Sequence, residues 1–157
     1  METPSDFAVA AATILQGYAI IHDDVFASSA WRRFRRVVPI PGLFEAVNYG
    51  THSVNLNRLR SELVQLRARA GSAVINPDSV NASTFLECFA RYTHALTHTI
   101  GRLEELCDGL ADASENRGGH TWQEYQSHVT EYERLRGVQL RLGIELNGLN
   151  ASMRDEA

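Results

Sequence analysis

The sequence contains no lysine, only two cysteines and no long hydrophobic run. All 15 basic residues are arginine, against 19 acidic residues, so the formal net charge of the 157 residues is −4. Without lysine, neither Schiff-base chemistry nor a P-loop phosphate site is available. The negative net charge argues against nucleic acid as a partner. No apolar run reaches the roughly 20 residues of a membrane-spanning helix, so we expect no transmembrane segment.

The two cysteines, Cys88 and Cys107, fall within one predicted helix. Their spacing corresponds to about 28 Å along a helix axis, which is too far for a disulfide between them. Both lie on the apolar side, where cysteine packs as a small hydrophobic residue. The first basic residue is Arg32, so the N-terminus lacks the charged start of a secretory signal peptide. We therefore expect a reduced, cytoplasmic protein.

Hydrophobic residues recur at helical spacing in four segments, and no segment alternates as a strand does. The predicted helices cover about residues 4–38, 43–70, 82–110 and 122–150. Two adjacent acids leave open a break in the first helix near residues 22–24. Because short connections favour antiparallel neighbours, we predict an all-α fold. It is an antiparallel bundle of four long helices in a single helical domain, residues 1–157.

Asp23 and Asp24 stand near the end of the apolar run of the first helix, and Arg32 and Arg33 follow them. Aspartate is a poor helix-interior residue and is costly to bury unpaired. Carboxylates can hold Mg²⁺, which takes further ligands from water and substrate phosphate, while arginines neutralise the remaining phosphate oxygens. Two interpretations follow from the residues alone. One is a diphosphate site, and the other is a helix break capped by aspartate with the arginines in solvent.

The segment Leu15–Asp24, followed by Arg32 and Arg33, resembles the first aspartate-rich motif of the trans-isoprenyl diphosphate synthases. Further segments are similar to that family in the same order: Pro41–Gly50, Gly101–Leu106, Trp122–Tyr125 and Gly137–Leu142. The resemblance implies an isoprenoid-synthase-like bundle. It also implies Mg²⁺-assisted ionisation of an allylic isoprenyl diphosphate, followed by elongation with isopentenyl diphosphate. Carried over to this chain, Asp23 and Asp24 are metal ligands, and Arg32 and Arg33 bind the diphosphate.

The chain also departs from the pattern of that family. Ala27 stands where the motif has its third aspartate, and Leu135–Arg136 replaces a Lys-Thr pair. In Gly101–Leu106, arginine and glutamate replace glutamine and aspartate. The Gly-Lys-Arg segment and the second aspartate-rich motif are missing. Diphosphate ionisation needs metals held from two facing walls. We therefore expect a truncated or degenerate relative, either a prenyltransferase or a non-catalytic subunit in a homo- or hetero-oligomer.

Two other hypotheses stay open. A class I terpene cyclase shares the fold and also uses an acidic first motif. A non-enzymatic interaction or regulatory protein would use the same residues only to cap and solvate a helix. An enzyme-like chain should bring the Asp23–Asp24 pair, Arg32 and the polar side of Gly101–Glu105 to one cavity lined by Tyr18 and Phe26. In an interaction protein these groups should scatter over the surface.

Two weaker signals concern histidine and arginine. His94 and His98 form an i, i+4 pair opposite the apolar stripe of the third helix. Without a third close donor, this pair indicates a solvated polar face rather than a metal site. The cluster Arg32–Arg36 fits an anionic membrane surface or nucleic acid as well as a phosphate ligand, and four arginines are too few to decide among them.

Overall fold

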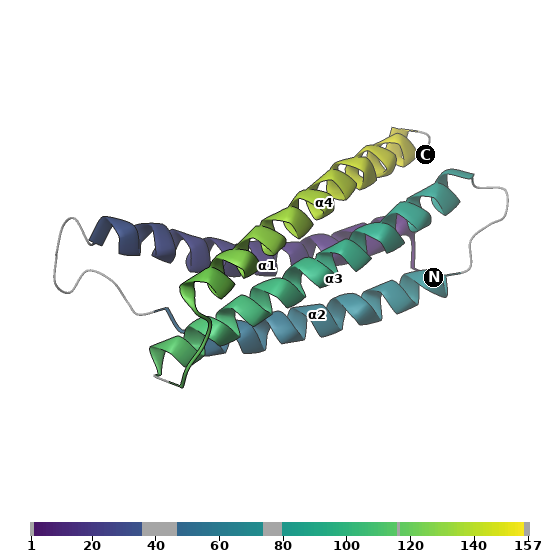
Figure 1. Ribbon diagram of the computed structural model, residues 1–157. Helices are drawn as coiled ribbons and strands as arrows, with labels where there is room; N and C mark the ends of the chain where they lie inside the picture. Colours follow the sequence, from purple (N-terminus) through teal and green to yellow (C-terminus); the bar gives the residue numbers. More distant parts are fainter. Residues whose placement is uncertain (1, 36–46, 74–79, 116, 156–157) are drawn as a thin grey trace.

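The structure, a computed structural model, describes residues 2–35, 47–73, 80–115 and 117–155, and describes only the backbone of residues 27–35. It contains four α-helices: α1 (Pro4–Arg35), α2 (Tyr49–Gly71), α3 (Val80–Ser114) and α4 (Trp122–Asp155). Successive helices run in opposite directions (Figure 1). The described residues include no strand. The predicted all-α, antiparallel four-helix architecture is therefore confirmed.

Capping residues define three of the helix starts. At α1, the Thr3 backbone N–H donates to Asp6 Oδ2 at 2.8 Å, and the Asp6 N–H donates to Thr3 Oγ1 at 3.3 Å. Thr121 and Glu124 form the same capping box at α4, with distances of 2.7 and 3.2 Å. At α2, Asn48 Oδ1 accepts from the Thr51 N–H at 3.0 Å. The predicted start near residue 43 is therefore wrong, because the asparagine cap sets the start of α2 at Tyr49.

The break left open near residues 22–24 does not occur, because α1 is one helix from Pro4 to Arg35. Asp23 and Asp24 are both exposed, so the helix continues without burying either carboxylate. α3 and α4 run past their predicted ends, to Ser114 and Asp155. The predicted end of the first helix near Val38 lies outside the described residues.

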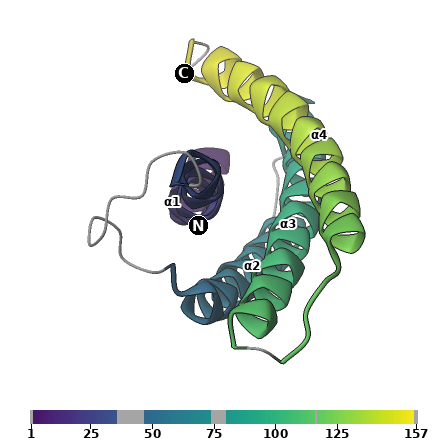
Figure 2. The same cartoon turned by 60° about the vertical axis from the view of Figure 1, so that its left-hand side comes forward.

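Helices α2, α3 and α4 form a curved row, and α1 lies on the concave side of that row (Figure 2). α3 is the middle member and contacts all three other helices, whereas the contact between α1 and α4 is the smallest. One cluster of buried side chains from all four helices forms the core. Within it, the rings of Phe7 and Phe89 lie 5.9 Å apart and join α1 to α3. None of the helices, as far as the chain is described, is both long and apolar enough to cross a membrane.

Candidate functional site

Asp23 and Asp24, the predicted metal ligands, are exposed on α1. Asp24 Oδ2 lies 2.5 Å from Nε2 of His52, so this pair links α1 to α2. In the part of the chain that the structure describes, no group of three histidine, cysteine or acidic side chains could hold a metal ion. Asp24 thus already has a protein partner, and the acidic pair has no third donor there.

Arg32 and Arg33, the predicted diphosphate ligands, lie in the last turns of α1, and their side chains are outside the described residues. Because α1 is unbroken, helical geometry sets the Cα of Arg32 about 13.5 Å along the axis from Asp23. Nine residues also turn the helix by two and a half turns, so these two positions lie on opposite faces. The backbone therefore does not bring Asp23 and Arg32 together.

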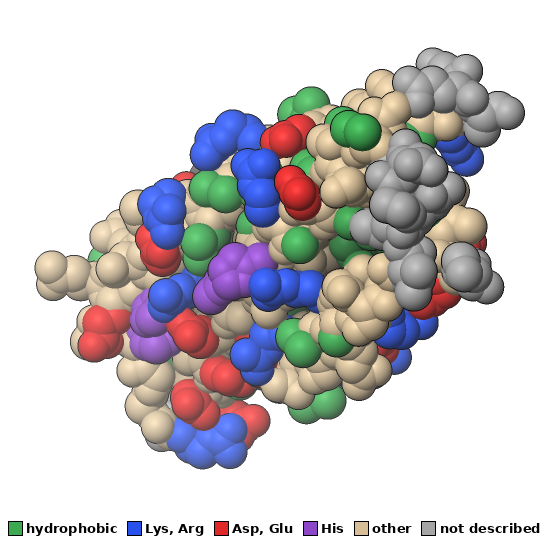
Figure 3. Space-filling view, turned by 90° about the vertical axis from the view of Figure 1, so that its right-hand side faces the viewer, with side chains coloured by type: hydrophobic (Ala, Val, Ile, Leu, Met, Phe, Trp, Pro, Cys, Tyr) green, Lys and Arg blue, Asp and Glu red, His purple; other side chains and the backbone are tan. Residues whose placement is uncertain are grey.

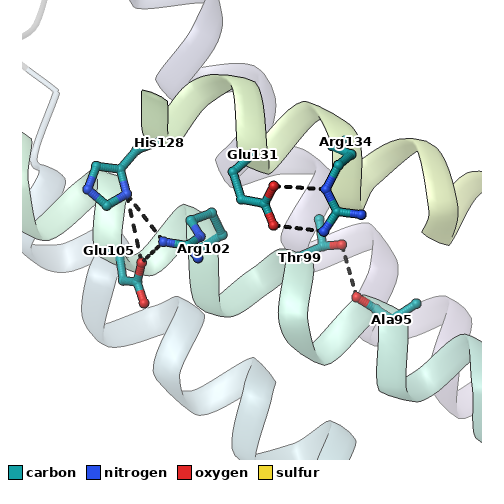
Figure 4. Close-up of polar contacts among 7 residues, drawn as sticks. All are labelled: Ala95, Thr99, Arg102, Glu105, His128, Glu131 and Arg134. Carbon is teal, nitrogen blue, oxygen red and sulfur yellow. Dashed lines mark hydrogen bonds and ion pairs between the residues drawn. The ribbon is translucent and has the colours of Figure 1, made fainter. Parts of the chain in front are cut away.

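The polar residues of Gly101–Glu105 contact two different neighbouring helices, α2 and α4. Glu104 accepts hydrogen bonds from Nδ2 of Asn57 at 2.9 Å and pairs with Nε of Arg60 at 3.1 Å, both on α2. Arg102 lies 2.7 Å from Glu105 Oε2 and 3.3 Å from Nδ1 of His128 on α4 (Figure 4). These contacts join α3 to its neighbours in the curved row. Within the described structure they do not bring the segment to Asp23 and Asp24.

A different set of polar groups meets between α1 and α4. The hydroxyls of Tyr18 and Tyr132 share a hydrogen bond, and Nδ1 of His22 lies 2.6 Å from the Tyr132 hydroxyl. Phe26 stacks on the Tyr132 ring, with centroids 5.4 Å apart and planes inclined by 13°. The sequence did not single out Tyr132 as a site residue. The hydroxyl group of Tyr132 could have indicated this cluster, because a buried tyrosine hydroxyl usually needs a hydrogen-bond partner.

Burial controls the protonation of this tyrosine–histidine chain. It raises the pKa of Tyr18 and of Tyr132, so both phenols keep their protons. Burial also lowers the pKa of His22, the charge of Arg136 on α4 lowers it further, and Asp23 opposes them. A neutral His22 can accept from Tyr132, whose oxygen then accepts from Tyr18. The chain is a neutral link between helices rather than an acid–base pair poised near pH 7.

A small hollow lies beside this link, between α1 and α4, with a volume of about 210 Å³. Alanines of α1 and Gly143 of α4 line its sides, and Tyr92 of α3 also contributes. Gln139, only 2% exposed, lines it as well. Its Nε2 donates to the Tyr92 hydroxyl at 3.4 Å, while its Oε1 is buried without a hydrogen-bond partner. Most of the lining side chains are thus apolar, and one lining residue, Gln139, has an unpaired amide oxygen, a feature that the helical periodicity did not indicate.

The predicted polar face of α3 and the predicted buried cysteines are confirmed. His94 and His98 are exposed, and Nη1 of Arg67 lies 3.2 Å from Nδ1 of His94. Cys88 and Cys107 are free and buried. One face of the molecule shows acidic and basic side chains interspersed, with histidines among them (Figure 3). This face lacks the single-sign basic patch that nucleic-acid binding requires.

Two features on the α1–α4 side therefore combine burial, polar groups and a specific geometry. One is the tyrosine–histidine chain beside Arg136, and the other is the hollow at Gln139. Comparisons with protein-family models, with curated proteins and with solved structures find no match to this chain.

Proposed function

We propose that this chain works by binding rather than by catalysis, as an interaction protein that pairs with a second copy of itself. The observation that supports this proposal is a long uncharged surface on α1. No charged residue occurs from Phe7 to His22, yet Val9 and Ile20 are 64% and 65% exposed. Exposed apolar side chains in a stretch without charge mark a surface that a partner can cover. The outward side of α1 therefore suits an apolar partner.

The outward face of α1 consists of Val9, Thr13, Gln16 and Ile20, which follow the alternating four- and three-residue spacing of a helix–helix seam. This pattern is self-complementary. When two copies pair antiparallel about a two-fold axis, Val9 meets Ile20 of the partner subunit, and Thr13 meets Gln16 of the partner subunit. The Thr13 hydroxyl already donates to the Val9 carbonyl at 3.1 Å, so its oxygen is free to accept from the partner's Gln16 amide.

The ends of the outward face add an electrostatic signature. The same pairing sets Asp6 of one copy opposite Asp23 of the partner subunit, so like charges meet at both rims. Salt screens such exposed charges. A dimer formed through this face should therefore become tighter as salt concentration rises, which is opposite to an interface held by ion pairs.

The position of the predicted catalytic groups also favours a binding role. Asp24 is paired with His52, and the unbroken α1 separates Asp23 from Arg32. Glu104 and Arg102 take part in contacts with α2 and α4. Each of these groups has a structural partner or position that needs no substrate.

Sedimentation equilibrium of the purified chain tests the proposal. We expect a monomer–dimer equilibrium that shifts toward dimer at high salt. Ile20→Lys should yield a monomer at all concentrations. Val54→Lys is the matched control, because Val54 is 70% exposed on α2 and lies outside the proposed interface. A wild-type monomer throughout, or equal loss of dimer in both variants, would contradict the proposal.

A second candidate, favoured by the position of Arg136, is Mg²⁺-dependent binding of an allylic diphosphate. The charges of Arg136 and Asp23 act on His22 in opposite directions, so both groups are near enough to affect the pKa of its imidazole. Asp23 and Asp24 would hold Mg²⁺, which accepts two carboxylates and keeps several waters. Arg32, Arg33 and Arg136 would then neutralise the diphosphate, as in an isoprenyl diphosphate synthase-like or terpene cyclase-like chain.

Calorimetric titration of farnesyl diphosphate, with and without Mg²⁺, separates this candidate from the first. Metal-dependent binding that is lost in Asp23→Asn/Asp24→Asn and weakened in Arg136→Gln would support it. Glu87→Gln is the control, because Glu87 is an exposed acid on α3. Equal heats in the wild type and in the double variant would reject the diphosphate site.

A further inference from the structure

We propose that the hollow between α1 and α4 binds a compact, neutral, largely apolar molecule carrying one hydroxyl group, of which phenol is the simplest example. The hydroxyl pairs with the amide of Gln139. This inference is independent of the proposed pairing of α1. The hollow lies against Ala8, which is about 110° around the helix from the centre of the outward face, and against Ala12 at the edge of that face.

The size of the hollow sets the size of the ligand. Its volume is about 210 Å³. An aliphatic cavity of about 150 Å³ in another protein holds benzene, so a single substituted ring fits here. Small residues create this space: Ala8, Ala11 and Ala12 line the α1 side, and Gly143 lies opposite. A Cβ on Gly143 would stand 3.3 Å from Cε2 of Tyr92, so even one methyl group there would crowd the ring.

The chemistry of the hollow sets the polarity of the ligand. Among the described residues, no charged side chain lines the hollow, and apolar side chains such as Ala8, Leu15, Leu140 and Ile144 form most of its lining. A charged ligand would lose hydration and gain no opposite charge in return. A neutral molecule avoids this penalty, and its ring would lie against the alanine, leucine and isoleucine side chains.

Gln139 requires the hydroxyl group. Its Oε1 is buried without a partner, and leaving a buried acceptor unpaired is unfavourable. A half-turn of the amide would exchange its nitrogen and oxygen, so that Tyr92 donates to the oxygen and an N–H is left unpaired instead. A hydroxyl group both donates and accepts. It therefore satisfies either orientation of the amide, whereas a ketone or an ether satisfies only one of them.

Calorimetry with phenol and toluene tests the inference, because the two rings are similar in size and only phenol carries the hydroxyl. We expect phenol to bind about tenfold more tightly than toluene, the effect of one net hydrogen bond. Equal affinities for the two compounds, or no binding of either, would overturn the proposal.

Two variants locate the binding. Ala8→Leu should fill the hollow and abolish phenol binding, whereas Ala68→Leu, at an exposed alanine of α2, should leave it unchanged. Gln139→Leu should remove the preference for phenol over toluene. Phenol binding that survives Ala8→Leu, or a preference that survives Gln139→Leu, would overturn the assignment. Circular dichroism of each variant checks the fold, and the Ala68 variant controls for the added leucine.

Discussion

The hydroxyl of Tyr18 on α1 is hydrogen-bonded to the hydroxyl of Tyr132 on α4, and both side chains are buried. This bond matters to the architecture because the contact between α1 and α4 is the smallest of the helix–helix contacts. His22 extends the chain from Tyr132, and Phe26 stacks on the Tyr132 ring. A short polar chain surrounded by aromatic rings therefore joins α1 to the far edge of the curved row.

Replacing either tyrosine by phenylalanine should destabilise the fold while preserving ring packing. Tyr132→Phe should cost about 2–3 kcal/mol, because it removes the partner of both Tyr18 and His22, and Tyr18→Phe about 1–2 kcal/mol. The double variant should lose less than the sum, since neither buried hydroxyl then remains unpaired. Urea denaturation of the four proteins measures the coupling. Strictly additive losses would show that the two hydroxyls do not interact.

Stability should fall as pH is lowered from about 7 to about 5. The pKa of His22 is lowered in the folded chain by burial and by Arg136, so the unfolded chain binds the proton more tightly. The stabilisation is complete above the ordinary histidine pKa of 6.5 and is lost progressively as the pH falls from this value through the lowered pKa of the folded chain. His22→Phe, which preserves the stacking, should flatten this slope. His98→Gln, at an exposed histidine of α3, provides the control variant. An unchanged slope in His22→Phe would refute the assignment.

Gly109→Ala should destabilise the protein. The same substitution made in a His120→Ala background should stabilise it instead. A Cβ on Gly109 would stand 2.1 Å from Cδ2 of His120, so the histidine must move. We expect a loss of about 1–3 kcal/mol from this overpacking. In the His120→Ala background the clash is absent, and alanine is favoured over glycine within a helix by about 1 kcal/mol. Thermal unfolding of the two pairs measures both effects, and a loss of equal size in both backgrounds would contradict the contact.

Both cysteines should be inert in the native protein. Burial raises the pKa of Cys107 to about 12, with smaller effects from Asp108 and Glu104, and burial also raises the pKa of Cys88. Thiolate is the reactive form, so alkylation near pH 8 should be slow for both residues. Mass spectrometry after a timed pulse of iodoacetamide should show no label in buffer and two labels in denaturant. Rapid native labelling of Cys107 would contradict its burial.

Local interactions made the helices predictable. Thr3–Asp6 and Thr121–Glu124 form the expected capping boxes, and the apolar stripe of α3 is buried from Phe85 to Cys107. Capping and helical periodicity depend on residues three or four apart, so a single sequence contains them completely. The start of α2 was predicted too early because apolar residues precede Asn48 in the sequence. Their spacing alone did not show that this asparagine caps the helix. The break in α1 was wrongly expected because adjacent aspartates also fit an exposed helix face.

Residue spacing along the chain was enough to predict the four helices, their buried faces, the buried cysteines and the uncharged stretch of α1. Which polar groups meet, in contrast, depends on how the helices pack. Asp24 pairs with His52, Tyr18 with Tyr132, and Gln139 with Tyr92, each across two helices. Such pairs depend on the angle and offset at which helices pack, and residue spacing within one helix does not specify these quantities. For the same reason, the hollow beside Gln139 appears only once α1 and α4 lie together.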